Sequence, residues 1–244
     1  MRYFMQLQYC GAPYVGWQIQ PDGSTVQGVL EDALGKLLRE KIGVTGAGRT
    51  DTGVNARYMV AHFDTGKPLP SDIVRRLNAM VGRDIAVERV WPVADDAHAR
   101  FDATERTYRY YVTTEKTAFF HRLCWQAPAG LDFEAMNRAA SLLLGRRDFT
   151  SFSKLHTQVK TNICDLRVAR WVEERPGVWY FEITADRFLR NMVRAVVGTL
   201  VDVGRGKMPP EAVTAILDRL DRCAAGTSMP AHALYLWEVK YKNN

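Results

Sequence analysis

Cysteine is scarce in this chain of 244 residues, and no stretch is apolar for long enough to cross a membrane. The cysteines are Cys10, Cys124, Cys164 and Cys223, which are far apart and form no Cys-x-x-Cys pair. Such spacing argues against a zinc ribbon or a disulfide framework and is typical of a reducing cytoplasm. A membrane span needs about 18 consecutive apolar residues, and the first eight residues alternate as in a strand and not as in a signal peptide. We therefore expect a cytoplasmic protein without a membrane segment.

An excess of charge is missing from the first part of the chain. Residues 1–103 contain 12 Lys and Arg against 12 Asp and Glu, whereas residues 104–244 contain 21 against 15. The formal net charge of +6 therefore lies entirely in the second part. Basic charge in one region is typical of a face that binds a polyanion, because phosphate contacts supply most non-specific affinity for nucleic acid. A slightly basic enzyme with solvated arginines is the alternative.

Two halves with the same order of elements are predicted from the hydrophobic pattern. In the first half, strands are expected at 2–9, 41–48, 58–64 and 85–93, and helices after Thr25 and after residues 71–72. In the second half, strands are expected at 106–113, 164–173, 178–185 and 233–241, and helices at 133–144, 188–203 and 210–220. Both halves follow the ferredoxin-like βαββαβ order, so we expect an α+β fold in which they form a mixed central sheet. The expected domains are 1–103 and 104–244.

The usual nucleotide-binding motifs are absent from the most unusual segment, which is Gly46–Ala56. A P-loop needs a lysine that this segment lacks, and the dinucleotide fingerprint needs a glycine where the chain has Asp51. What remains is a glycine-bounded loop that carries Arg49 and Asp51. A cationic neighbour can keep a carboxylate ionised, as a nucleophile or a base requires. Alternatively, Asp51 bonds its own backbone in a turn while Arg49 is solvated.

Arginine and tyrosine alternate along the predicted strand at 106–113. The alternation places Arg106, Tyr108 and Tyr110 on one face. An aromatic ring flanked by arginine can stack on a nucleobase while the guanidinium meets phosphate. Packing of these tyrosines in the core is an equally good interpretation.

Three arginines lie within two turns at the start of the predicted helix 188–203. They are Arg187, Arg190 and Arg194, and the spacing of the last two predicts that they point the same way. A solvated basic face is the usual explanation. A pair between one of these arginines and an active-site carboxylate is the sharper alternative.

Together these stretches resemble the tRNA pseudouridine synthase A family over nearly the whole chain. The motifs that carry the resemblance are Gly48-Arg49-Thr50-Asp51-x-Gly53-Val54, Arg106-x-Tyr108-x-Tyr110, Asp148-Phe149-Thr150-Ser151-Phe152 and Phe188-Leu189-x-x-Met192-Val193-Arg194-x-x-Val197-Gly198. The sequence departs from the family at Thr52, where alanine is usual, and at Asn55, where histidine is usual. Neither departure removes a charge that the chemistry needs.

The resemblance implies an isomerase with the pseudouridine synthase fold that converts uridine to pseudouridine at positions 38, 39 and 40 of the tRNA anticodon stem-loop. Asp51 would be the essential aspartate, and Arg49 would contact RNA or assist base flipping. Tyr108 would stack on the target base, and Arg194 would pair with Asp51. The resemblance further implies no metal or organic cofactor, and a homodimer with the tRNA lying across both subunits.

Two other functions remain as alternatives. One is a non-catalytic RNA-binding protein on the same scaffold, although such a protein would gain nothing from a carboxylate that faces phosphates. The other is a glycoside hydrolase that uses Asp51 and Asp64 as its paired carboxylates. The second is weaker because Asp64 is expected at the end of a strand, away from the loop.

Overall fold

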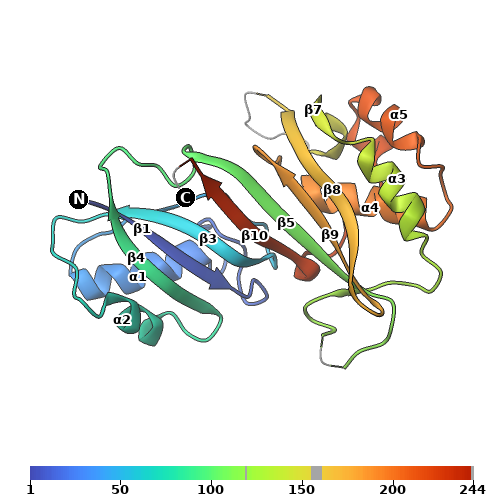
Figure 1. Cartoon of the computed structure of the whole chain (residues 1–244). Helices are drawn as coiled ribbons and strands as arrows, with labels where there is room; N and C mark the ends of the chain where they lie inside the picture. Colours follow the sequence, from blue (N-terminus) through green and yellow to red (C-terminus); the bar gives the residue numbers. More distant parts are fainter. Residues whose placement is uncertain (119, 155–160, 243–244) are drawn as a thin grey trace. The chain divides into compact units, whose positions relative to one another are not determined.

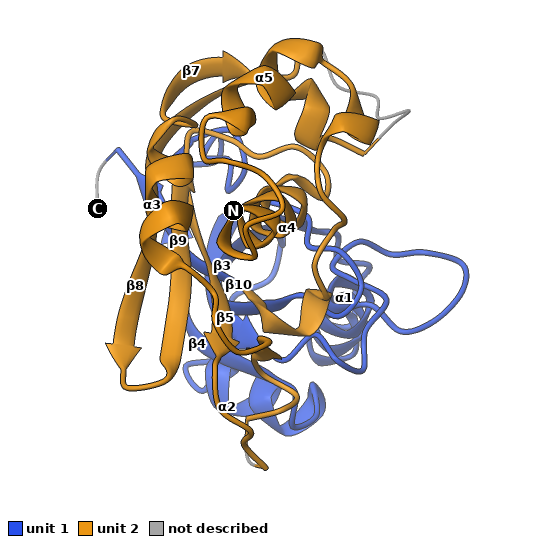
Figure 2. Cartoon of the chain, turned by 90° about the vertical axis from the view of Figure 1, so that its right-hand side faces the viewer, with its two compact units in different colours: residues 1–104, 235–244 blue, residues 105–234 orange. Residues whose placement is uncertain are grey.

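A computed structural model describes residues 1–118, 120–154 and 161–242 (Figure 1). The chain divides into two compact units, which Figure 2 colours separately. Unit 1 consists of residues 1–104 and 235–244, and unit 2 consists of residues 105–234. No helix in the described parts of the chain is long and apolar enough to span a membrane.

Unit 1 follows the βαββαβ order expected for the first half. Its elements are β1 (Arg2–Tyr9), α1 (Val26–Leu38), β2 (Val44–Gly46), β3 (Asn55–Asp64), α2 (Ile73–Met80), β4 (Ile85–Val93) and, from the other end of the chain, β10 (Leu234–Tyr241). The strand order is β4-β1-β3-β10, with β2 paired to β3. β1 is antiparallel to both of its neighbours, whereas β10 runs parallel to β3.

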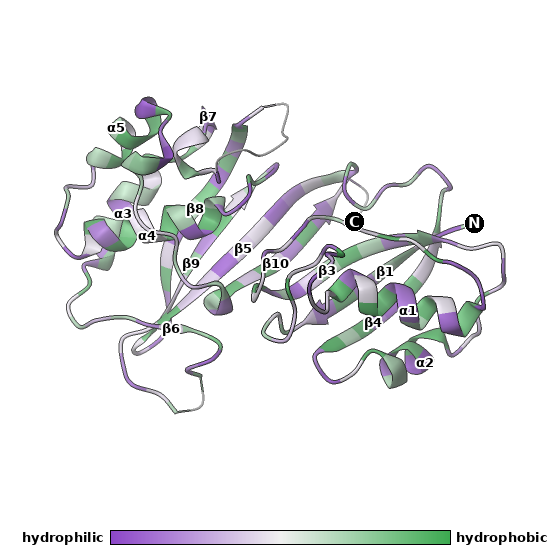
Figure 3. Ribbon diagram, turned by 180° about the vertical axis from the view of Figure 1, so that it is seen from behind, coloured by the Kyte–Doolittle hydropathy of each residue, from purple (hydrophilic) through white to green (hydrophobic). Residues whose placement is uncertain are grey.

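The two helices of unit 1 lie on one face of its sheet (Figure 3). α1 begins where it was expected, because the Thr25 hydroxyl accepts a hydrogen bond from the Gly28 N–H at 3.1 Å. Its apolar side is fully buried and consists of Val26, Leu30, Ala33, Leu34 and Leu38. The opposite face of the sheet has a smaller cluster, in which Phe4, Val60 and Ala99 are buried together.

Unit 2 follows the βαββα part of this order with additions, because the last strand expected for the second half, β10, belongs to unit 1. Its elements are β5 (Ala103–Thr113), β6 (Trp125–Gln126), α3 (Phe133–Ser141), β7 (Gly145–Asp148), β8 (Ile163–Arg175), β9 (Val178–Ala185), α4 (Met192–Gly204) and α5 (Ala212–Arg219). The strand order is β5-β9-β8-β7, with every pair antiparallel, and the short β6 runs parallel to β5. The sequence did not predict β6 and β7, which have only two and four residues. Parallel and antiparallel pairs occur in each unit, and this confirms the expected α+β class with mixed pairing.

Several boundaries differ from the expected ones, and for two of them the structure shows the cause. Residues 235–244 group with unit 1, because β10 pairs with β3, although the expected second domain ran to residue 244. α4 begins at Met192 and not at Phe188, because Asn191 has a φ of 66° and a left-handed conformation that a helix cannot continue. The segment 187–191 is therefore a turn.

Candidate active site

The loop between β2 and β3 presents the two charged residues that the sequence singled out. Arg49 is exposed, Asp51 is half-buried, and Thr50 between them is buried. The loop closes on itself, since the Val54 N–H donates to the carbonyl oxygen of Asp51 at 3.1 Å. The structure therefore holds Arg49 and Asp51 in one compact turn of unit 1, with their side chains separated by a buried anchor.

Thr50 is that anchor. Its hydroxyl lies 2.8 Å from the hydroxyl of Tyr9, at the end of β1, and its carbonyl oxygen accepts a hydrogen bond from the Trp17 N–H at 3.1 Å. Both tyrosine and threonine are buried, so their hydroxyls need a partner. These contacts could not be predicted from the sequence, because Tyr9 and Trp17 lie far from the loop along the chain.

Glycines allow the segment 11–17 to approach the loop closely. Gly16 has a φ of +98°, and a Cβ atom there would lie 2.7 Å from the carbonyl oxygen of Thr50. A Cβ atom on Gly11 would lie 2.2 Å from the carbonyl oxygen of Val54. Within the loop, Gly53 has a φ of +77°, and Gly46 makes room for the Trp17 ring. The glycines at 11 and 16 are therefore required by backbone packing under Asp51.

Asn55, at the end of the loop, has a structural role. Its side chain is 3% exposed, and its Oδ1 accepts a hydrogen bond from the Gly11 N–H at 2.8 Å. The residue therefore ties the end of the loop to the segment 11–17.

Tyr108 lies in unit 2, on the face of β5 that also carries Tyr110. Its ring is buried and meets the ring of Phe188 edge-on, with centroids 5.1 Å apart. Tyr110 is fully buried, and its hydroxyl has no hydrogen-bond partner among the residues that the structure describes. Burial raises the pKa of Tyr110, while the nearby Arg194 lowers it.

Arg194 lies in the first turn of α4 and is held by the segment before β10. Its Nε donates to the carbonyl oxygen of Met229 at 2.5 Å, and the Met229 N–H donates to the Arg194 carbonyl at 3.1 Å. Arg190 precedes the helix, so the helical spacing from which a common direction of Arg190 and Arg194 was predicted does not apply to them. Arg194 is half-buried, whereas Arg190 is exposed.

Asp64 does not share a site with Asp51. It lies at the far end of β3 from the loop, roughly 30 Å along the strand from Asn55 at about 3.3 Å per residue. It is paired with Arg2 at 2.8 Å, and that guanidinium lowers the pKa of Asp64. Glycosidases need two carboxyl groups within roughly 10 Å of each other. The alternative of a glycoside hydrolase that uses Asp51 and Asp64 is therefore wrong.

The sequence matches the family described as tRNA pseudouridine synthase over residues 6–102 and 139–242, which is most of the chain. This chain belongs to the tRNA pseudouridine synthase family. The matched ranges contain Arg49, Asp51 and Arg194, whereas Tyr108 lies between them.

Relatives in this tRNA pseudouridine synthase family cover almost the full length. A protein named tRNA pseudouridine synthase A from Parabacteroides distasonis is 54% identical over 243 residues, which cover 98% of this chain and 96% of that protein. A protein of the same name from Bacteroides fragilis is 53% identical, with 98% of this chain and 96% of that protein covered. The protein of that name from Bacillus subtilis is 41% identical, and the match covers 100% of this chain and 100% of that protein. The resemblance seen in the motifs is thereby confirmed.

Proposed function

We propose that this chain isomerises uridine to pseudouridine at positions 38, 39 and 40 of the tRNA anticodon stem-loop, with Asp51 as the catalytic residue. Membership of the tRNA pseudouridine synthase family makes it an isomerase that acts on tRNA. The observation that carries the proposal is the loop of unit 1, in which buried Thr50 fixes a half-buried Asp51 beside an exposed Arg49. In a member of this family, such a loop would present the Asp51 carboxylate to the substrate.

The reaction needs no net redox or hydrolytic step. The bond between N1 and C1′ breaks, the uracil ring turns, and a bond from C5 to C1′ forms. C5 then loses its hydrogen, and N1 gains one, so the atoms of substrate and product balance. Asp51 attacks C1′ or C6, or removes the proton at C2′, and each of these steps requires an ionised carboxylate.

Arg194 and Arg49 have different parts in this proposal. Arg194 pairs with Asp51 and keeps it ionised beside an uncharged base, because an opposite charge favours the charged form of a carboxyl group. Arg49 is exposed and therefore available to contact RNA or to assist base flipping. Asp51 belongs to unit 1 and Arg194 to unit 2, and their pairing is proposed from the resemblance to the family.

Tyr108 is the proposed stacking partner of the target base. Pulling a base out of its stack costs a few kcal/mol, and stacking on an aromatic ring returns roughly 1–3 kcal/mol. Phe188 supports this assignment, since its edge-on contact fixes the plane of the Tyr108 ring. The phenol of Tyr108 is also the proposed group near C5, where a proton must leave.

In this proposal, the basic second part of the chain binds the phosphates of the tRNA. Residues 104–244 hold the entire charge excess, and phosphate contacts from lysine and arginine give RNA affinity that falls with salt. The remaining parts of the proposal are a homodimer with the tRNA across both subunits and a cytoplasmic location, where tRNA is available.

The central test compares Asp51→Asn with the wild type on tRNA that contains uridine. The expected result is no pseudouridine by carbodiimide mapping, with tRNA affinity largely kept, because only the ionised carboxylate is lost. Asp218→Asn, which changes an exposed carboxylate on α5, is the matched control and should remain active. An active Asp51→Asn variant would remove Asp51 from the catalytic role.

The position of the modified uridines is tested separately. Pseudouridine is mapped in RNA from cells that lack this gene and from cells that carry it. The expected difference is confined to positions 38, 39 and 40. If those positions are unchanged while other tRNA positions differ, the assignment to the anticodon stem-loop is wrong although the enzyme class stands.

A further inference from the structure

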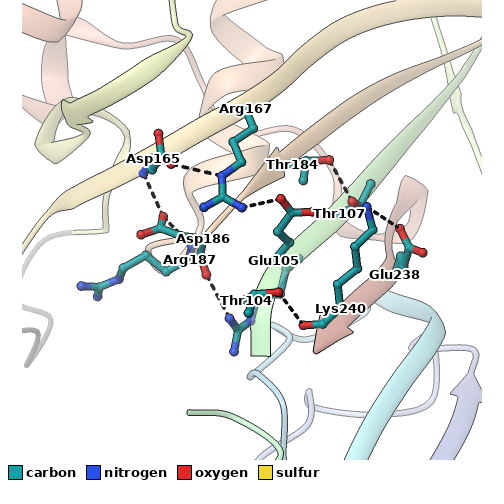
Figure 4. Close-up of polar contacts among 11 residues, drawn as sticks. Thr104, Glu105, Thr107, Asp165, Arg167, Thr184, Asp186, Arg187, Glu238 and Lys240 are labelled. Atoms are coloured by element: carbon teal, nitrogen blue, oxygen red, sulfur yellow. Dashed lines mark hydrogen bonds and ion pairs between the residues drawn. The ribbon is translucent and has the colours of Figure 1, made fainter. Parts of the chain in front are cut away.

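Asp186 connects three backbone segments of unit 2 at the point where β9 ends (Figure 4). Its Oδ1 accepts hydrogen bonds from the Asp165 N–H at 2.8 Å and from the Arg187 N–H at 2.7 Å. Its carbonyl oxygen accepts a hydrogen bond from the guanidinium of Arg106, on β5, at 2.9 Å. One residue therefore holds the start of β8, the start of β5 and the first residue of the turn 187–191.

This turn supports Tyr108 from the side. Phe188, two residues after Asp186, meets the Tyr108 ring at a centroid distance of 5.1 Å. Arg106, two residues before Tyr108 on the same face of β5, is the donor to the Asp186 carbonyl. Asp186 is therefore linked to Tyr108 in two ways, through Phe188 in the turn and through Arg106 on β5.

The far end of the turn is fixed as well. The carbonyl oxygen of Arg190 accepts a hydrogen bond from the Lys154 N–H at 3.0 Å. The Asn191 amide donates to the hydroxyl of Ser228, and its backbone is left-handed. With that end held, a loss of the Asp186 carboxylate would let the turn shift mainly at Arg187 and Phe188.

We infer that Asp186 is a positioning residue for Tyr108, acting through the turn 187–191 and through Arg106. The inference rests on the proposed function, in which Tyr108 stacks on the target base. The Oδ1 atom acts as a hydrogen-bond acceptor for two backbone N–H groups, and an amide oxygen can do the same. Positioning of the turn therefore requires the acceptor oxygen of the Asp186 side chain but not its negative charge.

A neighbouring ion pair provides a control. Arg167, on β8, is paired with Glu105 and, at 3.1 Å, with Asp165 (Figure 4). These pairs connect the starts of β5 and β8, as Asp186 does, but Arg167 donates no bond to the turn. Arg167→Ala therefore loosens the same end of the sheet and leaves the acceptor for Arg187 in place.

The experiment measures kcat and KM for tRNA in Asp186→Ala, Asp186→Asn and Arg167→Ala. Because a displacement of about 1 Å in a catalytic group can cost about a hundredfold, we expect kcat of Asp186→Ala to fall roughly ten- to hundredfold, with KM changed much less. Asp186→Asn should recover most of the rate, and Arg167→Ala should stay within about twofold of the wild type, since surface ion pairs contribute little. An Asn variant as slow as the Ala variant, or an unaffected Ala variant, would overturn the inference.

A structural readout separates this inference from the proposed function. With 3-fluorotyrosine incorporated, the fluorine resonance of Tyr108 is assigned by its loss in Tyr108→Phe. Asp186→Ala should shift this resonance in the free protein, and Asp186→Asn should not. A wild type that makes no pseudouridine would refute the function alone, whereas an unmoved resonance would refute the positioning role alone.

A second variant covers the case in which Asp186→Ala does not fold. Phe188→Leu keeps an apolar side chain against Tyr108 and removes the aromatic edge. We expect the same shift of the Tyr108 resonance and the same loss in kcat as in Asp186→Ala. No change in either quantity would show that the turn does not position Tyr108.

Discussion

The hydroxyl of Tyr9 lies 2.8 Å from the hydroxyl of Thr50, so the last residue of β1 is hydrogen-bonded to the residue just before Asp51. Both side chains are buried, with 5% of Tyr9 and 7% of Thr50 exposed. Asp51, the proposed catalytic residue, thus directly follows a residue that is hydrogen-bonded to an inner strand of the unit 1 sheet. A rigid strand is a better support for a catalytic group than a free loop.

The first prediction concerns this hydrogen bond. Tyr9→Phe leaves the buried Thr50 hydroxyl without this partner, and we expect the free energy of unfolding to fall by about 1–3 kcal/mol. Thr50→Val alone should cost a similar amount, because it removes the same hydrogen bond from the side of Thr50. The double variant should lose clearly less than the two single losses combined, since both polar groups are then gone. Urea unfolding of the four proteins measures this, and strictly additive losses would contradict the pairing.

The second prediction concerns the close approach of Gly16 to the same residue. Gly16→Ala introduces a Cβ atom 2.7 Å from the Thr50 carbonyl at a φ of +98°, and both the contact and the backbone are strained. We expect a loss of about 1–3 kcal/mol in the free energy of unfolding and a lower kcat, because the anchor under Asp51 must move. Gly66→Ala is the matched control, since nothing lies within 4 Å of its added Cβ. Equal stability of the two variants would show that the segment 11–17 yields without disturbing the loop.

The elements that the sequence predicted well are those specified by neighbouring residues. β1 and β4 have the expected bounds, because alternation of apolar and polar residues defines each strand locally. The start of α1 was also correct, since Thr25 directly precedes the helix and caps it by accepting a hydrogen bond from the Gly28 N–H, three residues further along. Arg49 and Asp51 stand out in the sequence because glycines and charges cluster within one short segment, and the structure places both residues in one compact turn.

The features that the sequence did not reveal depend on contacts between distant residues. The pairing of β10 with β3 joins segments about 180 residues apart, and no local pattern encodes it. The left-handed Asn191, which delays α4, is bonded to Ser228. Thr50 looked like an ordinary loop residue until the fold brought Tyr9 to it.

The third prediction concerns the helix that carries Arg194. A Cβ atom on Gly198 would lie 1.8 Å from the carbonyl oxygen of Thr227, two residues before the Met229 carbonyl that accepts the bond from Arg194. Gly198→Ala must push this segment away from α4. We therefore expect the free energy of unfolding to fall by about 1–3 kcal/mol or more, and kcat to decrease. Thermal unfolding and single-turnover kinetics measure the two effects.

Gly204→Ala provides the comparison within the same helix. Its added Cβ would meet the sulfur of Met136 at 2.4 Å, and a methionine side chain is flexible enough to move. Alanine also favours the helix by up to about 1 kcal/mol relative to glycine. The loss should therefore be clearly smaller than for Gly198→Ala, and the reverse order would contradict the argument.

The fourth prediction is a pH dependence that originates at His62, on β3. Its ring is 6% exposed, and its Nδ1 accepts a hydrogen bond from the Ala99 N–H at 3.2 Å. Burial, and then the nearby charge of His98, lower the pKa of His62 to about 4. In the unfolded chain the pKa returns to about 6.5, so the unfolded state binds more protons between these two values.

The stability that neutral His62 provides is therefore complete above about pH 6.5 and is lost as the pH falls toward 4. For this one group, the free energy of unfolding should decrease by about 1.4 kcal/mol per pH unit within that window. His62→Asn keeps an acceptor for the Ala99 N–H but does not titrate, so its slope should be shallower than that of the wild type by about this amount. His121→Gln, which changes an exposed histidine, should keep the wild-type slope. Urea unfolding at several values between pH 4.5 and 7 measures the slopes, and identical slopes for wild type and His62→Asn would show that His62 is not the group responsible.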